Sequence, residues 1–171
     1  MGDLEDRRSR LATVRAEFLA CPTVELRGVP DHVAASWRRS VSRGIEPCAV
    51  VSEYHADLDV GSRLVRSALP VVDQLVEQLG DVPVCVALTD DRARLLVRRD
   101  SSSRFGRVAD GLCFAQGFGY AEGSVGTNGV GTVLESGGSV HIVGAEHFVE
   151  SLQPYACAGA PVHDPFTGRI E

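Results

Sequence analysis

The chain lacks lysine altogether, because all 17 basic residues among its 171 are arginines. Without lysine there is no Schiff-base nucleophile, no phosphate-loop lysine and no Ser-Lys dyad. A nucleophile elbow is also missing, since Ser124 in the glycine-rich segment does not stand in the pattern G-x-S-x-G. These absences exclude several classes of enzyme, and we predict no catalytic residue.

Long hydrophobic runs are absent as well. No apolar run approaches the roughly 18 residues of a membrane span, and residues 1–6 are acidic rather than signal-like. We therefore expect a cytoplasmic chain that makes no membrane contact. Hydrophobic residues make up 44% of the sequence, which is typical of a globular fold. The length fits one domain with a flanking helical extension.

Cysteine pairs that could hold a metal or form a redox motif are missing. The five cysteines are scattered and contain no C-x-x-C: Cys21, Cys48, Cys85, Cys113 and Cys157. In a cytosolic chain such cysteines are usually buried, reduced thiols. A chain of this length can fold without disulfides or metal. We predict no metal site and no cofactor.

Net positive charge is lacking too. The formal net charge is -6, and residues 120–171 hold six acids against one arginine. A phosphate backbone would be repelled by such a chain unless its basic residues clustered on one face. We predict no direct contact with nucleic acid.

Periodicity and breakers predict helices in the first half of the chain and strands in the second. The expected helices cover residues 4–21, 31–44 and 58–80, with a kink or a new start at Pro70, and short helices follow at 128–136 and 146–152. The expected strands cover residues 84–88, 95–97, 140–143 and 155–162, and residues 100–123 are expected to form loops with a short strand near 112–114. This order favours an α+β fold with an antiparallel sheet.

Three ordered motifs in the last fifty residues resemble one family. They are Glu122-x4-Thr127-Asn128-Gly129-x-Gly131-Thr132, the Gly-Ala-Glu-His-Phe of residues 144–148, and the Cys-Ala-Gly-Ala-Pro-x-His-Asp-Pro of residues 157–165. Together with Ser-Trp-Arg-Arg-Ser at 36–40, they resemble the GAF sensor domains of bacterial activators for acetoin and dihydroxyacetone catabolism. The resemblance covers roughly residues 30–171.

The resemblance implies an α+β GAF (PAS-like) domain with a central antiparallel sheet of five or six strands flanked by helices. It places a helical extension at residues 1–57 and the GAF domain at 58–171, with the last strand truncated. One departure is the hairpin turn at residues 90–93, which lacks the family's usual glycine after Asp. The family normally continues into a DNA-binding output domain, and nothing of that kind is present in this sequence.

Eight residues are candidates for contact with a ligand in such a fold. Thr127, Asn128 and Thr132 could supply neutral hydrogen bonds, although the glycine-rich segment around them also fits a plain backbone turn. Glu146 and His147 could touch the ligand or serve local structure. The three remaining candidates are Phe118 and Tyr120, as pocket wall or core, and Cys157, as a buried hydrophobe or a thiolate sensor beside His147 or His163.

The leading interpretation is a regulatory domain that binds a small carbon metabolite or a partner protein and controls a DNA-binding output. The apolar stripes of the long N-terminal helices predict a homodimer. One alternative is a thiol enzyme of the free methionine sulfoxide reductase type, which needs Cys113 and Cys157 at one pocket. The other alternative is a pure dimerisation or interaction module.

Overall fold

The structure is a computed structural model that describes residues 2–48, 50–80 and 82–171, and the side chains from residue 5 onward. The chain divides into two compact units, and each unit is built from two separate stretches of sequence. The first unit comprises Met1–Val50 and Glu122–Pro161, and the second comprises Val51–Ala121 and Val162–Glu171. Among the described residues, no helix combines the length and apolar character that crossing a membrane requires.

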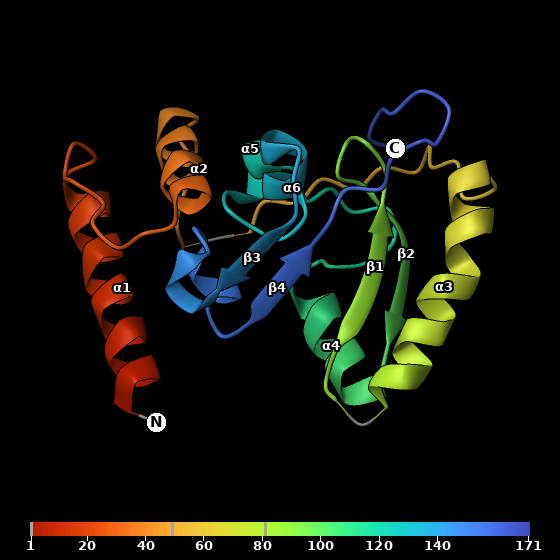
Figure 1. Ribbon diagram of the computed structural model, residues 1–171, viewed down its shortest axis with the longest axis horizontal. Helices are drawn as coiled ribbons and strands as arrows, with labels where there is room; N and C mark the ends of the chain where they lie inside the picture. Colours follow the sequence, from red (N-terminus) through yellow and green to blue (C-terminus); the bar gives the residue numbers. More distant parts are fainter. Residues whose placement is uncertain (1, 49, 81) are drawn as a thin grey trace. The chain divides into compact units, whose positions relative to one another are not determined.

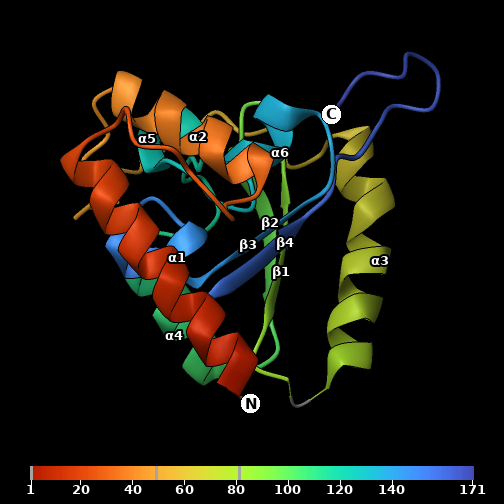
Figure 2. The ribbon, with the colours of Figure 1, turned by 60° about the vertical axis from the view of Figure 1, so that its left-hand side comes forward.

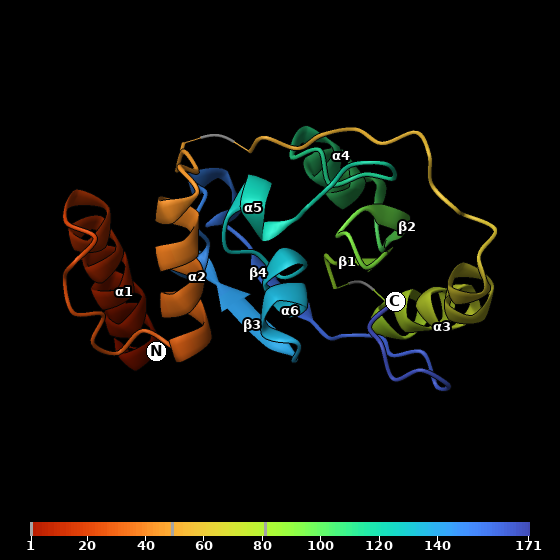
Figure 3. The same ribbon diagram turned by 90° about the horizontal axis from the view of Figure 1, so that it is seen from above.

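The first unit joins the two N-terminal helices to the glycine-rich half of the chain. Its elements are α1 (Gly2–Ala20), α2 (Asp31–Ser42), α5 (Glu122–Val125), α6 (Gly131–Ser136), β3 (Val140–Val143), η1 (Gly144–Glu146), η2 (Glu150–Leu152) and β4 (Ala156–Gly159). Strands β3 and β4 pair in antiparallel fashion, with Val140 opposite Gly159. Seen from above, α2 lies between α1 and the α5–β3 region (Figure 3).

Aromatic side chains hold the core of the first unit together. The rings of Phe18 on α1 and Trp37 on α2 stack with centroids 5.6 Å apart, and both side chains are fully buried. Ile142 and Phe148 from the second stretch of this unit close the same core. The expected helices at 4–21 and 31–44 are confirmed, and Figure 2 shows α1 and α2 inclined to each other. Their apolar faces are used largely for this packing.

The second unit is a hairpin with a long helix against it. Its elements are α3 (Arg63–Leu79), β1 (Cys85–Thr89), β2 (Leu95–Asp100) and α4 (Ser103–Gly111). Strands β1 and β2 are antiparallel, and Val65 and Val72 of α3 pack with Leu88 and Leu96 of the hairpin. Figure 1 shows α3 running alongside this hairpin. The helix continues through Pro70 rather than ending there.

The turn of this hairpin, at residues 90–93, forms without the glycine that the resemblance leads one to expect there. Ala93 adopts the left-handed conformation, with φ at 63°, and its N–H donates to the carbonyl of Asp90. The Asp90 carboxylate accepts from the N–H of Arg94 and from its guanidinium at 2.6 Å. The Asp side chain therefore stabilises a turn that the family usually makes with glycine.

The sheet differs from the expected one. In the described ranges the strands form two sheets of two strands each, in place of one central sheet of five or six. Residues 112–114 are not a strand. In place of one helix over 146–152, the chain forms two 3₁₀ segments, η1 and η2, that are separated by residues 147–149. Helix α4 occupies part of the expected loop, because the Ser102 side chain caps it by accepting from the N–H of Phe105.

Candidate functional site

A buried carboxylate, Glu122, organises the polar interior of the first unit. Its side chain is 0% exposed. One oxygen, Oε1, accepts from Nε of Arg39 at 2.6 Å, and Oε2 accepts from Oγ of Ser36 at 2.6 Å and from Nη2 of Arg39 at 3.0 Å. The hydroxyl of Thr132 also donates to Oε2, at 3.1 Å. Together with Thr127, these side chains are called the Glu122 cluster below.

The carboxyl group of Glu122 stays ionised. Burial raises the pKa of the Glu122 carboxyl, but the hydrogen bonds from Arg39, Ser36 and Thr132 and the arginine's charge outweigh it, so the net shift is downward. The hydrogen bond to Glu122 likewise raises the pKa of Arg39. Helix α2 and the segment beginning at Glu122 are therefore joined by a buried charge pair, which is costly to break by removing one partner.

The glycine-rich segment after Glu122 is held by its own side chains. Oδ1 of Asn128 accepts from the N–H groups of Val130 and Gly131, and its amide nitrogen donates to the carbonyl of Gly126 at 2.7 Å. The hydroxyl of Thr127 lies 2.6 Å from that of Ser36. The predicted polar candidates Thr127, Asn128 and Thr132 therefore lie together, and each bonds to a protein atom.

Glycines in this segment and on β4 allow close packing. Gly126 has φ at 71°, and a Cβ there would come within 2.7 Å of the Phe148 side chain. A Cβ on Gly159 of β4 would meet the backbone oxygen of Gly129 at 2.0 Å. These contacts account for the glycines by backbone geometry and close approach.

Glu146, His147 and Cys157 lie in the same unit. The Glu146 carboxylate accepts from the N–H of Val143 at 2.7 Å, and its backbone carbonyl accepts from the indole of Trp37. His147 Nδ1 lies 3.1 Å from the carbonyl of Gly144, and Nε2 lies 3.4 Å from Sγ of Cys157. Because only a donor suits a carbonyl, we assign the proton to Nδ1, which leaves Nε2 to accept from the thiol.

The His147–Cys157 pair is neutral. Burial lowers the pKa of His147 to about 4, so the imidazole carries no charge at pH 7. Burial raises the pKa of the Cys157 thiol. A reactive thiolate needs a nearby cation, and at this position His147 does not provide one.

The aromatic candidates belong to the second unit. The Phe118 ring meets that of Tyr54 edge-on at 5.3 Å between centroids, and Tyr120 is buried edge-on against Phe114 at 4.8 Å. The Tyr120 hydroxyl donates to the carbonyl of Leu112. Six of the eight candidates thus share one unit, while Phe118 and Tyr120 line up beside β2 in the other.

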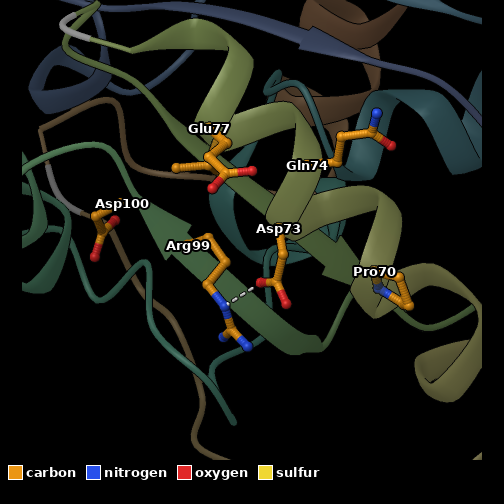
Figure 4. A pocket seen from close by; sticks show the side chains of 7 residues that line it. Pro70, Asp73, Gln74, Glu77, Arg99 and Asp100 are labelled. Carbon is orange, nitrogen blue, oxygen red and sulfur yellow. Dashed lines mark hydrogen bonds and ion pairs between the residues drawn. The ribbon is translucent and has the colours of Figure 1, made fainter.

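A groove that the sequence did not suggest lies beside the C-terminal half of α3 (Figure 4). It encloses about 400 Å³ and is lined by Pro70, Asp73, Gln74, Val76, Glu77, Arg99 and Asp100. Arg99 pairs with Asp73 at 2.7 Å across it. Within the described ranges, no group of three or more His, Cys, Asp or Glu side chains is placed to hold a metal ion.

Ser36, Arg39 and Glu122 were not predicted as site residues from the sequence. One signal was available, since Ser36 and Arg39 are three residues apart and so share a helix face. Nothing local points from that face to Glu122, which is 86 residues from Ser36 in the chain.

Comparison with known proteins gives close relatives. The propane 2-monooxygenase operon transcriptional activators MimR of Mycolicibacterium smegmatis and Mycolicibacterium goodii are each 38% identical over 156 residues, which is 91% of this chain and 27% of theirs. The acetoin dehydrogenase operon transcriptional activator AcoR of Bacillus subtilis is 26% identical over 77% of this chain and 23% of its own length. The chain thus spans about a quarter of the length of these activators.

A solved structure shares the fold. The crystal structure of the E. coli DhaR(N)-DhaL complex matches with a TM-score of 0.70 and 22% identity, over 82% of this chain and 49% of that chain. The sequence also matches the family described as the N-terminal domain of MimR over residues 9–171. The chain therefore belongs to the MimR N-terminal domain family.

Proposed function

We propose that this chain is the signal-receiving part of a bacterial transcriptional activator, a cytoplasmic GAF-type regulatory domain that controls a DNA-binding output without touching DNA itself. Its membership of the MimR N-terminal domain family supports this proposal. The relatives are named as activators of operons for propane 2-monooxygenase and acetoin dehydrogenase. We infer that the effector is an uncharged carbon compound about the size of propane or acetoin.

The observation that carries the proposal is the Glu122 cluster. It links α2 to the segment that contains Thr127, Asn128 and Thr132, through the bonds of Ser36 and Arg39 to the Glu122 carboxylate. An effector that rearranges this segment must therefore act on α2 as well. A ligand shifts such an equilibrium by its difference in affinity for the two arrangements.

Neutral hydrogen-bonding groups suit an uncharged effector. The proposed uncharged contacts are Thr127, Asn128 and Thr132, together with His147 and Cys157 from the same unit. The carboxylate of Glu146 is a further proposed contact in this unit. The neutral imidazole and thiol of the His147–Cys157 pair belong to this set and add no charge. The thiol-enzyme alternative gains no support from a thiol whose pKa burial has raised.

A protein input is the second candidate. The matching solved structure is a complex of DhaR(N) with DhaL. By analogy, a partner protein could dock on this chain in place of a metabolite. We also include the homodimer that the apolar helix stripes predict, since two-fold dimers are the commonest soluble oligomers.

A thermal-shift screen with C3 and C4 alcohols, ketones and hydroxyketones, including acetoin and dihydroxyacetone, tests the small-molecule proposal. A true effector raises the melting temperature in a saturable way, by an amount that corresponds to roughly 2.7 kcal/mol at 100 times its Kd. Thr127→Val should lose this shift, measured against its own ligand-free melting temperature. Thr167→Val, in an exposed turn of the second unit, should keep it. If no compound shifts the wild type, the small-molecule proposal fails and the partner-protein candidate takes its place.

A further inference from the structure

Arg15 of helix α1 lies inside the first unit although it carries a charge. The residue is only 8% exposed. Burial lowers the pKa of its guanidinium, and the charge of Glu150 offsets this effect only in part. In the part of the chain that the structure describes, no carboxylate forms an ion pair with Arg15. A buried cation without an ionised partner is costly, so stability alone does not explain its place.

The guanidinium of Arg15 binds two acceptors in the segment that follows His147. Its Nη2 donates to the backbone carbonyl of Phe148. With the amide of Gln153 oriented so that its oxygen faces Arg15, that oxygen accepts from Nε at 3.2 Å and from Nη1 at 3.1 Å. The rigid planar fork of an arginine suits two acceptors held at once. Arg15 therefore ties residues 148–153 to helix α1.

The backbone of Phe148 connects this arginine to the segment proposed to bind the effector. Its N–H donates to the carbonyl of Thr127 at 3.4 Å, while its carbonyl accepts from Arg15. A single residue thus bonds to the glycine-rich segment on one side and to α1 on the other. A shift of either partner acts on the other through Phe148.

His147 lies between two backbone carbonyls that the N-terminal helices hold. The carbonyl of the residue before it, Glu146, accepts from the indole of Trp37 on α2 at 2.8 Å. The carbonyl of the residue after it, Phe148, accepts from Arg15 on α1. The imidazole can therefore change its position only if these bonds stretch or break.

We propose that Arg15 is a positioning residue of the effector site, which holds the imidazole of His147 in place and couples this site to helix α1. The inference rests on the proposed function, in which His147 contacts the effector. An effector that displaces His147 acts on α1 through Arg15 and on α2 through Trp37. Binding then shifts the population between two arrangements of both helices.

The coupling can be measured without any effector, because a change at Arg15 must be felt at His147. A test on the ligand-free chain can therefore fail while the proposed function stands. A failed effector screen, in turn, leaves its result unchanged.

NMR titration of the whole chain with labelled histidine side chains makes this test, and His147→Gln assigns the signal. The pKa of His147 is about 4 in the wild type, because the ring is buried. Arg15→Met should raise this pKa by at least ~1 pH unit, which is tenfold in the proton-binding constant, because the released ring reaches water. Ser40→Ala is the matched control. It removes a buried hydrogen bond of α2 in the same unit and should leave the pKa of His147 unchanged.

Arg15→Lys separates position from charge. Lysine keeps the positive charge but lacks the planar fork that holds Phe148 and Gln153 together, so the pKa of His147 should rise in this variant too. If Arg15→Met does not fold, Gln153→Leu takes its place, because it removes only the acceptor of Nε and Nη1 and should also raise this pKa.

Three results would overturn the proposal. The first is a pKa of His147 that stays at its wild-type value in Arg15→Met, or in Gln153→Leu where that variant replaces it. The second is a rise in Arg15→Met that Arg15→Lys does not show, because the cause would then be the lost charge. The third is an equal rise in Ser40→Ala, because the cause would then be general loosening of the unit.

Discussion

At the scale of single residues, the most informative pair is His147 and Cys157. His147 is fully buried and Cys157 is half-buried in the first unit, and Nε2 lies 3.4 Å from Sγ. Burial acts on them in opposite directions, lowering the pKa of the imidazole and raising that of the thiol. Each shift favours the neutral form, so the hydrogen bond joins two uncharged groups.

The neutral histidine predicts a pH dependence of folding. Its pKa is about 4 in the folded chain against about 6.5 when unfolded. The unfolded chain therefore binds the extra proton first, and the free energy of unfolding falls as the pH drops from 6.5 towards 4, by about 3 kcal/mol in all. Urea unfolding at several pH values measures this slope, and His147→Gln should flatten it. If the exposed-site variant His163→Gln flattened it equally, the assignment to His147 would be wrong.

The cysteines should differ in reactivity. Partial burial raises the pKa of the Cys157 thiol, whereas the hydrogen bond with Thr23 lowers the pKa of the exposed Cys21. Since the thiolate is the reactive species, we expect Cys21 to be alkylated at least ~10 times faster than Cys157 in the native chain. Mass spectrometry after timed iodoacetamide labelling gives both rates. Equal rates would favour an accessible, activated Cys157 and revive the thiol-sensor hypothesis.

At the scale of elements, helix α2 bonds to two separate parts of the first unit. Its indole at Trp37 donates to the carbonyl of Glu146, while Ser36 and Arg39 bond to Glu122. Neighbouring residues of one helix thus hold both ends of the 122–147 segment. The segment proposed to bind the effector is therefore joined to α2 by hydrogen bonds at both of its ends.

Removing the buried charge should test that link. Glu122→Gln keeps the shape but leaves Arg39 without its ionised partner, and we expect the free energy of unfolding to fall by about 2–4 kcal/mol. Chemical denaturation provides the value. Glu135→Gln is the matched control, because Glu135 pairs with Arg43 at the surface and should change stability by less than about 1 kcal/mol. Equal effects of the two variants would show that Glu122 contributes no more than a surface charge.

The second unit contains a comparable link at its C-terminal hairpin. Arg63 at the start of α3 pairs with Asp164 and Glu171, and its guanidinium lies 5.6 Å from the Phe166 ring centroid. The N–H groups of Thr167 and Phe166, together with Arg63, hold the pKa of Asp164 well below its usual range. The turn has its own hydrogen bonds, so the arginine tethers it rather than forms it.

Loss of this tether should release the hairpin without unfolding the chain. In Arg63→Ala, amides of residues 163–170 should exchange with deuterium at least ~10 times faster, while the midpoint of global unfolding stays near that of the wild type. Hydrogen–deuterium exchange with peptide resolution makes the measurement. Arg66→Ala, which loses a bond to the carbonyl of Gly61, is the control. Unchanged exchange in Arg63→Ala would contradict the tether.

At the scale of the whole molecule, the two compact units interleave along the chain. The core of the first unit draws Phe18, Val33 and Trp37 from one stretch and Ile142 and Phe148 from another. The boundary between an extension at 1–57 and a GAF domain at 58–171 stays a prediction. A cut at this boundary would remove Phe18, Val33 and Trp37 from the shared core.

A deletion tests that boundary. We expect the fragment 58–171 to lose cooperative unfolding of the 122–161 stretch, because its apolar residues would have no helices to cover them. Thermal unfolding followed by circular dichroism, compared with the whole chain, measures the effect. A fragment that unfolds in one sharp transition near the wild-type temperature would support an independent domain at 58–171.

Local patterns in the sequence were enough to predict several elements. Apolar spacing and helix breakers predicted a helix at residues 31–44, which is α2, and the short apolar runs around residues 84–97 predicted the β1–β2 hairpin. Both signals work because helix and strand periodicity depend on neighbours in the chain. Family motifs pointed to an activator-type domain, and the relatives are indeed named activators.

Other features depended on distant partners. Helix α4 contains Gly106 and Gly111, which weaken the local helix signal, and its start rests on the Ser102 cap. The Glu122 cluster required α2 to pack on a segment more than eighty residues away, and the neutral state of His147 required burial that no spacing encodes. Periodicity places side chains on a face, but only the packing of faces brings a carboxylate to its arginine and removes an imidazole from water.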